Sequence, residues 1–519
     1  MTAVRGYAET AYGQLHYAET GTGPVLLLLH QTPRSHDEFR EVQPLLATGR
    51  RVIAMDMLGF GMSAPLAAPQ TIERIADGTF ALLDALGVAD AAVLGHHTGG
   101  VVAIEMAARR PERVRALVLS CTPWTDPDAG HPDDPPVDVA TPADNGDHLI
   151  TLWSLRRPYY PAGRPDLLDR FIRDALAPGV DPAEGHRACA RYRMADRAGL
   201  VTAPVLLLAG AADPFSLPAL PVLGERLTNA AAIESRVLDG GVPLMEEAPD
   251  AVAAAVDAFL RTSEAAGRLR DAAATRVTCP PVRDLLGDSD VALAYAVQRR
   301  LTTARLAAGA RLTGWKIGLT SPAVQRQLGV DRPDFGVLFA DMDVSTLDEV
   351  PSGRLLQPKA EAEIAFVLGA DLDGELDPAT VRAAVEYAVP ALEIVDSRIA
   401  GWDITITDTV ADNASSGLYV LGEERLPLDK LEPAEVIMRL FVDGEQVSRG
   451  SGAACLGDPL NALLWLARMA RELGEPLRAG QVVLSGALGP MVPAVPGTTV
   501  RAELDLLGSV SATFSRESA

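Results

Sequence analysis

The sequence predicts an α/β protein built from two halves, and three observations support this prediction. The chain has 519 residues, which is long enough for several hydrophobic cores. In the first half, apolar strand-like runs alternate with helical stretches, as in a parallel sheet that is covered on both faces. In the second half, short helices are followed by strand-like segments with turn residues between them, which indicates a mixed α/β domain.

The apolar runs of the first half have the length of buried strands. They read PVLLLLH, RRVIAMD, AAVLGHH, RALVLSC and APVLLLAG. A helical pattern covers Val101 to Arg109, and the helix EEAPDAVAAAVDAFL closes this half near Arg261. Between about 123 and 200 the regular pattern breaks into Pro, Asp, Arg and aromatic residues. We interpret this stretch as a cap inserted above the carboxyl edge of the sheet.

The boundary between the halves is predicted near residue 262, which gives domains 1–262 and 263–519. No Gly/Ser-rich linker marks it, because SEAAGRLRDAAATR continues as a charged amphipathic helix. The strand-like segments beyond it are AEAEIAFVL, ALEIVDSR, VIMRLFVDG, QVVLSGAL and TTVRAELDLLGSVSATF.

Charge and cysteine content exclude several classes of function. A formal net charge of -23 and a pI near 4.8 repel phosphate backbones and anionic lipids, so we expect neither nucleic acid nor a membrane as partner. The start, MTAVRGYAETAYGQLHY, lacks the apolar core of a secretion signal, and we expect a cytoplasmic protein. Four widely spaced cysteines form no CxxC motif and are interpreted as buried, unreactive thiols.

Five motifs of the first half occur in a characteristic order. They are LLLLH, DMLGFGMS at 56–63, GHHTGG at 95–100, AGAADP at 209–214 and DGGVPLMEEAPD at 239–250. Together they resemble the α/β-hydrolase fold over about 1–262. The resemblance implies a chain order of nucleophile, acid and histidine. It also implies that a cap insertion covers the catalytic edge.

Two of the three catalytic positions implied by this resemblance hold residues that differ from a serine triad. His97 occupies the nucleophile position, Asp213 the acid position and Val242 the base position. A serine triad needs a hydroxyl, an imidazole that takes its proton and a carboxylate that orients the imidazole. Two of these are absent, and no Gly-x-Ser-x-Gly motif occurs in the chain. Backbone amides near Gln31 and Thr98 are expected to leave an anion site in place.

Three interpretations of His97 stay open. The imidazole can act as a general base on water or on a substrate proton, because it titrates near neutrality. It can also accept an acyl group. Alternatively, the pocket is catalytically silent and serves as a ligand site, a scaffold or a docking surface. We expect no ordinary esterase activity, with His97 and Asp213 as the candidate catalytic residues of this half.

Acidic residues are the notable feature of the second half. Side chains alternate along a strand, so Glu361 and Glu363 project to one face, and Glu393 lies in another apolar run. All eight histidines precede residue 200. Carboxylates without histidine favour a hard divalent ion, Mg²⁺ or Mn²⁺, over zinc. The spacing alone also fits exposed glutamates on an edge strand.

Longer motifs run through the whole second half in order. They include GWKIGLTSPAVQRQLGVDRPDFGVLFADM at 314–342, LLQPKAEAEIAFVL at 355–368, PALEIVDSRIAGWDI at 390–404 and DTVADNASSGLYVLG at 408–422. Together they resemble 2-keto-4-pentenoate hydratase, a member of the fumarylacetoacetate-hydrolase-like superfamily with its β-roll domain. The resemblance implies a divalent metal held by Glu361, Glu363 and Glu393. It also implies hydration of a 2-hydroxy-2,4-dienoate to a 4-hydroxy-2-oxo acid.

The same motifs supply four further candidates. Lys316 is expected to transfer a proton or to steady an enolate. Asp341 is expected to orient Lys316 or water, and the alternative is an ordinary turn aspartate. Ser485 is placed to hydrogen-bond a substrate carboxylate, and Asp408 to line the pocket. The substrate is expected to be a small 2-oxo or 2-hydroxydienoic acid, and the protein to be a homo-oligomer.

Alternatives remain for both halves. Hydrolytic relatives use a histidine-linked carboxylate, which a half without histidine cannot build. The related 2-oxo-3-enedioate decarboxylases keep the metal ligands and the lysine, so this activity stays open. The fused chain is then either bifunctional, with a C–C hydrolase preceding the hydratase, or a hydratase whose first half is only a binding or assembly module.

Overall fold

The computed structural model describes residues 3–127, 138, 141–321, 325 and 330–516. The chain divides into two compact units, Met1–Leu260 and Arg261–Ala519. Helix α9 (Pro249–Thr275) runs without a break through this division. In its second part, Ala265, Leu269 and Ala272 are buried against residues of the second unit such as Val297 and Ile399. Their helical spacing explains why the segment is an amphipathic helix rather than a flexible linker.

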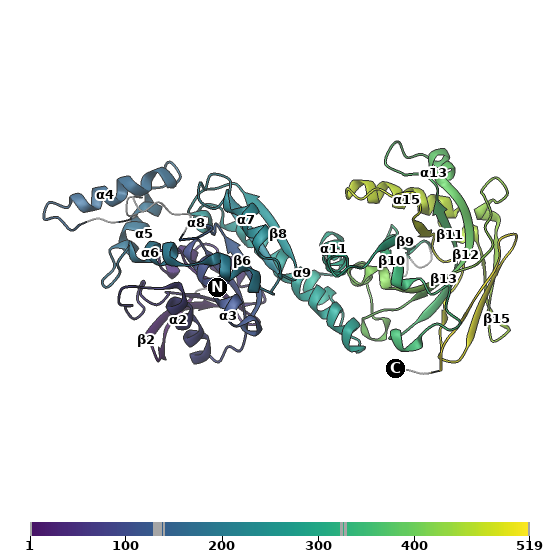
Figure 1. Cartoon of the computed structure of the whole chain (residues 1–519), viewed down its shortest axis with the longest axis horizontal. Helices are drawn as coiled ribbons and strands as arrows, with labels where there is room; N and C mark the ends of the chain where they lie inside the picture. Colours follow the sequence, from purple (N-terminus) through teal and green to yellow (C-terminus); the bar gives the residue numbers. More distant parts are fainter. Residues whose placement is uncertain (1–2, 128–137, 139–140, 322–324, 326–329, 517–519) are drawn as a thin grey trace. The chain divides into compact units, whose positions relative to one another are not determined.

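The first unit contains an eight-stranded sheet with the order β1-β2-β4-β3-β5-β6-β7-β8 (Figure 1). β1 and β2 pair antiparallel, as do β2 and β4, and the remaining pairs are parallel. The strands are β1 (Val4–Thr10), β2 (Gly13–Thr20), β3 (Val25–Leu29), β4 (Arg51–Met55), β5 (Ala91–His96), β6 (Val114–Ser120), β7 (Val205–Gly210) and β8 (Ile233–Leu238). The five predicted strands correspond to β3 to β7.

Helices cover both faces of this sheet, which explains the continuous apolar runs. In β3, Leu27 and Leu29 belong to one buried cluster, whereas Leu26 and Leu28 belong to the other. The first cluster contains α2 (Ile72–Ala85), α3 (Thr98–Arg109) and α7 (Ala219–Arg226). The second contains α1 (Gln43–Leu46), α8 (Leu244–Glu247) and the start of α9, and the short turns are η1 (His36–Phe39) and η2 (Pro111–Arg113).

The helices of the predicted cap lie between β6 and β7. They are α4 (Asp147–Arg156), α5 (Pro165–Ala175) and α6 (Glu184–Arg191), with the turns η3 (Arg157–Tyr159), η4 (Met194–Asp196) and η5 (Ala198–Leu200). Buried ion pairs fasten them to the sheet unit: Arg34 Nε lies 3.0 Å from Asp174, and Arg170 Nε lies 2.8 Å from Asp37. Residues 128–137 and 139–140 of the predicted cap lie outside the described residues.

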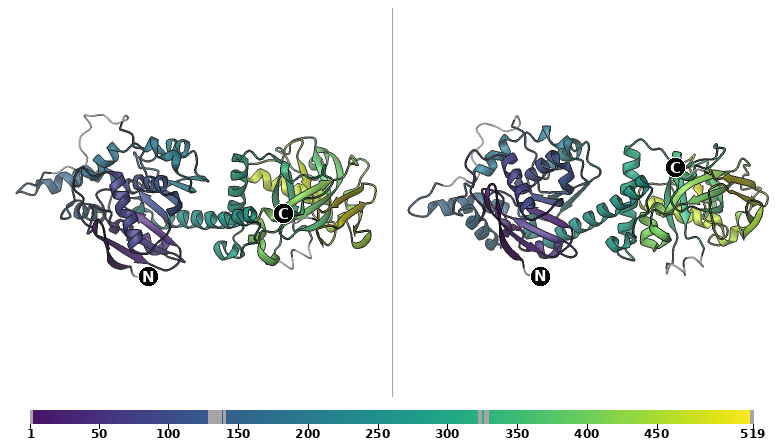
Figure 2. Two further views of the ribbon diagram at one scale, coloured as in Figure 1. Left: turned by 60° about the horizontal axis from the view of Figure 1, so that its bottom comes forward. Right: turned by 90° about the horizontal axis from the view of Figure 1, so that it is seen from below.

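The second unit is built on two sheets (Figure 2). The larger has the order β10-β9-β16-β11-β12-β13, with β17 beside β11, and the smaller has the order β15-β14-β18-β19. β9 and β16 are parallel, and the other pairs are antiparallel. The strands are β9 (Leu312–Gly318), β10 (Asp334–Phe339), β11 (Lys359–Leu368), β12 (Val385–Val395), β13 (Ser416–Leu421), β14 (Ile437–Val442), β15 (Glu445–Ser451), β16 (Val482–Leu484), β17 (Val492–Pro493), β18 (Thr499–Leu504) and β19 (Gly508–Thr513).

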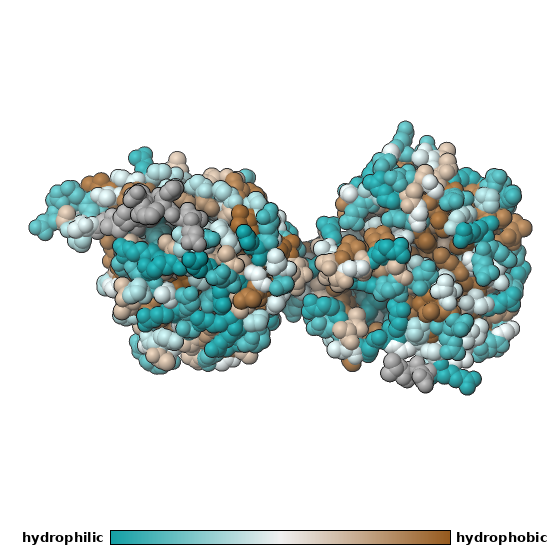
Figure 3. Space-filling view, in the orientation of Figure 1, coloured by the Kyte–Doolittle hydropathy of each residue, from teal (hydrophilic) through white to brown (hydrophobic). Residues whose placement is uncertain are grey.

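Short helices surround these sheets. They are α10 (Arg283–Leu286), α11 (Val291–Ala307), α13 (Pro378–Ala384), α14 (Ile406–Ala411) and α15 (Pro459–Glu472), with the turns η6 (Ala340–Met342), η7 (Ser352–Arg354), η8 (Ala400–Trp402), η9 (Asn413–Ser415), η10 (Pro433–Glu435) and η11 (Gly452–Ala454). The face in Figure 3 is largely hydrophilic on both units, and hydrophobic residues gather near the middle of the second. Within the described residues, no helix has the length and apolar character needed to cross a membrane.

Candidate active and metal site

Three glutamates converge on one face of the larger sheet in the second unit. β11 and β12 pair antiparallel with Glu361 directly opposite Glu393, and Glu363 follows two residues later on the same face. One carboxylate oxygen from each lies within 4.8 Å of the other two. Like charges placed directly opposite each other destabilise a strand pair. A bound cation would offset this repulsion.

The hydrogen bonds of the cluster leave oxygens free. Glu363 Oε2 accepts a hydrogen bond of 2.8 Å from the Gly486 backbone N–H. Glu363 Oε1 and Glu393 Oε2 are buried and have no hydrogen-bond partner among the described residues. Buried polar atoms are normally satisfied, so free carboxylate oxygens indicate a missing partner. Oxygen ligands of this kind fit a hard divalent cation.

The pKa values of the three carboxyl groups reflect this crowding. Burial, followed by the charge of Glu393, raises the pKa of Glu361 to about 7. Burial and both neighbouring carboxylates raise the pKa of Glu363 well above its ordinary value. Burial also raises the pKa of Glu393, although Lys316 opposes this. Without a cation the cluster therefore holds protons near neutral pH, and a cation would displace them.

Lys316 on β9 reaches the same cluster. Its Nζ lies 3.2 Å from Glu393 Oε1 and donates a hydrogen bond of 2.9 Å to the Ala414 carbonyl. Burial alone would lower the pKa of Lys316, but the carboxylates of Glu393 and Asp334 outweigh it and raise the pKa. β16 and β11 lie between β9 and β12 in the sheet, so the contact between Lys316 and Glu393 requires a strongly curved sheet.

Asp334 is a site residue that the sequence reasoning missed. This first residue of β10 is buried, and its Oδ2 accepts a hydrogen bond of 3.2 Å from Thr409 Oγ1. Its Oδ1 has no partner among the described residues. A Cβ at Gly318 would lie 2.2 Å from Asp334 Oδ1 and 3.5 Å from Lys316 Nζ, so the carboxylate and the ammonium share one space. The sequence signal that could have identified Asp334 is an acid at the start of the apolar run DFGVLF.

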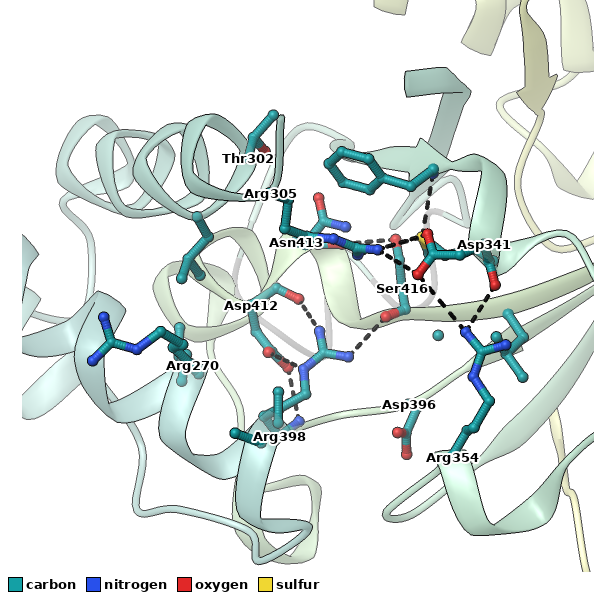
Figure 4. Close-up of a pocket in the computed structure, with 18 of the residues that line it drawn as sticks. Arg270, Thr302, Arg305, Asp341, Arg354, Asp396, Arg398, Asp412, Asn413 and Ser416 are labelled. Atoms are coloured by element: carbon teal, nitrogen blue, oxygen red, sulfur yellow. Dashed lines mark hydrogen bonds and ion pairs between the residues drawn. The ribbon is translucent and has the colours of Figure 1, made fainter. Parts of the chain in front are cut away.

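Asp341 does not lie beside Lys316, which corrects the predicted role. It sits in η6 with its side chain 58% exposed, and its two oxygens accept hydrogen bonds of 2.7 and 2.8 Å from Arg305. Figure 4 shows this pair at a separate cavity. Asp341 is therefore an aspartate of a charged surface pair, and the acid near Lys316 is Asp334.

Asp408 and Ser485, the two residues expected to bind substrate, lie in different surroundings. The Asp408 carboxylate accepts hydrogen bonds from the backbone N–H groups of Val282 and Thr405 and from Arg283 Nη1, at 2.8, 2.9 and 2.7 Å. It fastens the start of α14 rather than lining a pocket, which corrects the prediction. Ser485 is buried at the end of β16, next to the Gly486 amide that binds Glu363. Its contact with substrate stays a prediction.

In the first unit, the turn at His97 keeps the strained geometry of a nucleophile elbow. His97 links β5 to α3 with φ 48° and ψ -114°. A Cβ at Gly99 would lie 2.0 Å from the Leu29 carbonyl oxygen, so only glycine fits there. His97 Nε2 lies 3.1 Å from Asp213 Oδ2. Burial opposes ionisation of Asp213, but the contacts with His97 and Ser216 hold its pKa below the ordinary value.

The other two catalytic positions of this unit are altered. Val242 is buried at the base position, and its carbonyl lies 3.0 Å from His96 Nε2. The Gln31 N–H donates a hydrogen bond of 2.9 Å to Glu38 Oε2, so it is not free for an anion, which corrects the prediction made for it. Thr98 begins α3, and first-turn amides lack acceptors within their helix. The Thr98 half of the predicted anion site stays a prediction.

The two folds and the glutamate cluster define the class of protein: an α/β-hydrolase fold joined to a fumarylacetoacetate-hydrolase-type domain. Residues 24–241 match the α/β hydrolase fold family, and residues 326–515 match the fumarylacetoacetate (FAA) hydrolase C-terminal family. Through its C-terminal half, the chain belongs to the 2-keto-4-pentenoate hydratase family.

Two named hydratases support this assignment. A "TodF product hydratase" of Pseudomonas putida F1 is 55% identical over 254 residues, which cover 49% of this chain and 95% of that protein. A 2-keto-4-pentenoate hydratase of Burkholderia vietnamiensis G4 is 54% identical over 251 residues, covering 48% and 96%. A solved 4-oxalocrotonate decarboxylase of Pseudomonas putida G7, complexed with magnesium and adipate, is 33% identical with a TM-score of 0.47, covering 48% and 96%.

Proposed function

We propose that the C-terminal half hydrates a 2-hydroxy-2,4-dienoate of the 2-keto-4-pentenoate type to a 4-hydroxy-2-oxo acid. Glu361, Glu363 and Glu393 would hold a divalent cation, Mg²⁺ or Mn²⁺. The observation that carries the proposal is the convergence of these three carboxylates beside Lys316. The cation would act as a Lewis acid and template for the carboxylate and 2-oxygen of the substrate.

The remaining residues supply charge and protons. The dienol must ketonise before water can add at C4, and both steps pass through an enolate. Lys316 places a buried positive charge, fixed by the Ala414 carbonyl, where it can steady that enolate. Asp334 adds a carboxylate with one oxygen that has no hydrogen bond from the described residues, and this oxygen can accept or deliver a proton. We propose that Ser485 binds the substrate carboxylate.

The test of this proposal is the variant E361Q/E363Q. Glutamine keeps the size of the side chain but removes the charge that holds a cation. We expect a loss of dienoate turnover on the order of 10³-fold or more, because Lewis-acid stabilisation is worth several kcal/mol. Calorimetric titration with Mg²⁺ should show no binding at this site. E445Q changes an exposed glutamate of β15 and serves as the matched control. Full turnover by E361Q/E363Q would refute the metal site.

A 2-oxo-3-enedioate decarboxylase is the alternative reaction for this site. It would release CO₂ from its substrate instead of forming a 4-hydroxy-2-oxo acid. Purified protein with Mg²⁺ separates the two activities when CO₂ and the hydroxy acid are measured for both substrates. The high identity to hydratases supports hydration. A higher kcat/KM for CO₂ release would reverse this choice.

The first half has a second candidate function, favoured by the contact between His97 and Asp213. An imidazole held by a carboxylate can act as general base on water without a covalent intermediate. In a bifunctional chain it would cleave a ring-opened dienoic ketone and release the dienoate that the second half consumes. The rival interpretation is a binding or assembly module.

Product analysis separates these interpretations. E361Q/E363Q blocks consumption of the dienoate, so the full-length variant accumulates it if the first half cleaves a ring-opened substrate. The additional change H97A should then abolish this accumulation. If no dienoate forms above the uncatalysed rate, the module interpretation holds.

The proposal includes the cellular setting. We infer that the protein is a cytoplasmic homo-oligomer that acts on small acids in the breakdown of aromatic compounds and binds neither nucleic acid nor membranes. The strongly negative net charge supports the last point. Light scattering of the purified protein tests the oligomer directly.

A further inference from the structure

A cavity of about 550 Å³ lies in the second unit, outside the glutamate cluster. Its walls come from the last turns of α9, from α11 and from the segments that follow β10 and β12 (Figure 4). Volumes of this size are typical of small-molecule sites. The apolar part of the lining includes Leu269, Leu301, Phe339, Met342, Leu355 and Leu418.

The polar part of the lining carries an excess of positive charge. Four arginines and three aspartates line the cavity, although the chain as a whole has a net charge of -23. Asp396 is occupied, because it accepts hydrogen bonds from the Leu356 and Gln357 backbone N–H groups. A local positive region in an acidic protein attracts small anions.

Arg354 is the arginine with an incomplete partner. It donates a hydrogen bond of 2.7 Å to the main-chain oxygen of Asp341, but it lies 3.9 Å from the carboxylate. Asp341 gives both carboxylate oxygens to Arg305 instead. Burial, together with the positive charges of Arg354 and Arg398, lowers the pKa of Arg305 despite that pair. The single carboxylate of Asp341 therefore lies near the guanidinium groups of both Arg305 and Arg354. A second carboxylate, supplied by a ligand, would give Arg354 a partner of its own.

The cavity borders the loop that fixes Lys316. Arg398 donates hydrogen bonds to the Asp412 carbonyl and, at 2.7 Å, to the Ser416 carbonyl, which bracket this loop. Between them, Asn413, Ala414 and Ser415 all have left-handed φ values of 50° to 56°. Three such residues in succession are strained. The Ala414 carbonyl at the centre of this strained turn accepts the hydrogen bond of Lys316.

We propose that this cavity is a second binding site for an organic monocarboxylate with an apolar body, separate from the metal site. Arg354 would bind the carboxylate, and the leucine and phenylalanine side chains would contact the body. Through Arg398 and the loop 412–416, occupancy would alter the position of Lys316. This regulatory part rests on the proposed function, whereas the binding part does not.

Binding is tested on a full-length protein whose metal site is disabled. Calorimetric titration of E361Q/E363Q with 3-phenylpropionate in EDTA should show saturable binding. The neutral amide, 3-phenylpropanamide, should bind about tenfold more weakly or worse, because it cannot form the charged hydrogen bonds of the acid. Equal affinity for acid and amide, or no saturable binding, would overturn the site.

Two variants locate the ligand. R354Q should weaken binding of 3-phenylpropionate about tenfold, whereas R449Q, which changes an exposed arginine of β15, should not. L301W fills the cavity without changing its charge and should abolish binding. Circular dichroism verifies that each variant is folded. Unchanged affinity in both R354Q and L301W would place the ligand elsewhere.

Regulation is measured separately on the wild-type chain with Mg²⁺ and dienoate. Saturating 3-phenylpropionate should change kcat at least twofold, and R354Q should remove this change. Competition at the metal site would instead raise KM alone and persist in R354Q. If the acid binds E361Q/E363Q but leaves wild-type kcat unchanged, the regulatory part is wrong and the binding site remains. A chain without hydratase activity would still give the binding result.

Discussion

In both halves the fold brings reactive side chains together, but the two sites retain different numbers of the residues that catalysis needs. In the first half, the elbow at His97 and the position of Asp213 survive, yet the hydroxyl and the triad histidine are gone. In the second half, Glu361, Glu363 and Glu393 all lie within 4.8 Å of one another. The comparison teaches that glycines and apolar runs preserve a fold, whereas a few side chains decide what it can catalyse.

Hydrogen bonding distinguishes the carboxylates of the two sites, although His97 Nε2 also has no hydrogen-bond partner among the described residues. Asp213 is well satisfied, because Ser216 Oγ and the Phe215 N–H donate to it at 2.7 and 2.9 Å in addition to the contact with His97. Glu363 and Glu393 instead keep buried oxygens without partners among the described residues. Unsatisfied buried charge costs stability, and it is retained where a ligand completes it.

The largest effect after loss of the glutamates is expected for K316M. Methionine keeps most of the length and apolar contacts of the side chain but removes the charge beside Glu393. We expect kcat to fall about 10²- to 10⁴-fold, in the range of a lost proton-transfer group. Steady-state kinetics with the dienoate measure this fall.

The control for K316M is K430M, which removes an exposed lysine of the same half. Calorimetric Mg²⁺ binding by K316M should persist, because the three carboxylates are unchanged. If K316M retains more than a tenth of the wild-type kcat, Lys316 serves the structure rather than the reaction.

The parts of the fold and site that follow local patterns could be predicted from the sequence. The five buried strands of the first half have continuous apolar runs, and the two-residue period of a strand places Glu361 and Glu363 on one face. β8 escaped prediction because its residues, IESRVL, are largely exposed and give no apolar run. The antiparallel hairpin of β1 and β2 also lacks a continuous apolar core.

Features set by long-range geometry could not be predicted. Asp341 and Asp334 are both acids near an apolar strand, and the antiparallel pairing of β9 with β10, in which Asp334 lies opposite Gly318, places Asp334 beside Lys316. Asp408 has the sequence context of a polar loop, but its oxygens are used by backbone groups of residues 282, 283 and 405. The residues next to these aspartates in the sequence do not reveal which groups their carboxylates contact.

A smaller effect is expected from G318A, which tests the packing of Asp334 against Lys316. The new Cβ would lie 2.2 Å from Asp334 Oδ1, so the carboxylate must move. We expect a loss of about 1–3 kcal/mol in the free energy of unfolding, as for other overpacked sites. Activity should fall with it. G374A, where a Cβ meets nothing within 4 Å, is the control, and equal stability of the two variants would contradict this packing.

Bound Mg²⁺ should stabilise the second unit against unfolding, and the size of this effect should depend on pH. The pKa of Glu361 is raised from 4.5 to about 7, so the metal-free native state holds a proton that the unfolded chain has released. Stability from this group is therefore lost as pH rises from 4.5 through 7. Bound Mg²⁺ displaces the proton, so its stabilising effect should grow over the same window.

Differential scanning calorimetry measures this effect at about pH 5.5 and about pH 7.5 with and without Mg²⁺. The Tm shift of the second unit should be larger by a few degrees at the higher pH. The candidate ligand groups of the first unit, His16/His36/Asp56 and His97/Cys121/Asp213, contain histidine or cysteine, which Mg²⁺ does not favour. This unit therefore provides an internal reference that Mg²⁺ should leave unchanged. A larger shift at the lower pH would mean that the glutamates are not the ligands.

The smallest effect is expected for H97A in the hydratase assay. His97 and the glutamate cluster belong to separate compact units, and substitutions without shared partners act independently to within about 0.3–0.5 kcal/mol. We therefore expect kcat/KM for the dienoate to stay within about twofold of wild type. A larger loss, with the glutamates intact and Mg²⁺ binding unchanged, would show that the first half delivers substrate to the second. In that case the first half, with its altered triad, would be a binding module. The reason is that a substitution at His97 would then affect the hydratase reaction only if both halves handle the same substrate molecule.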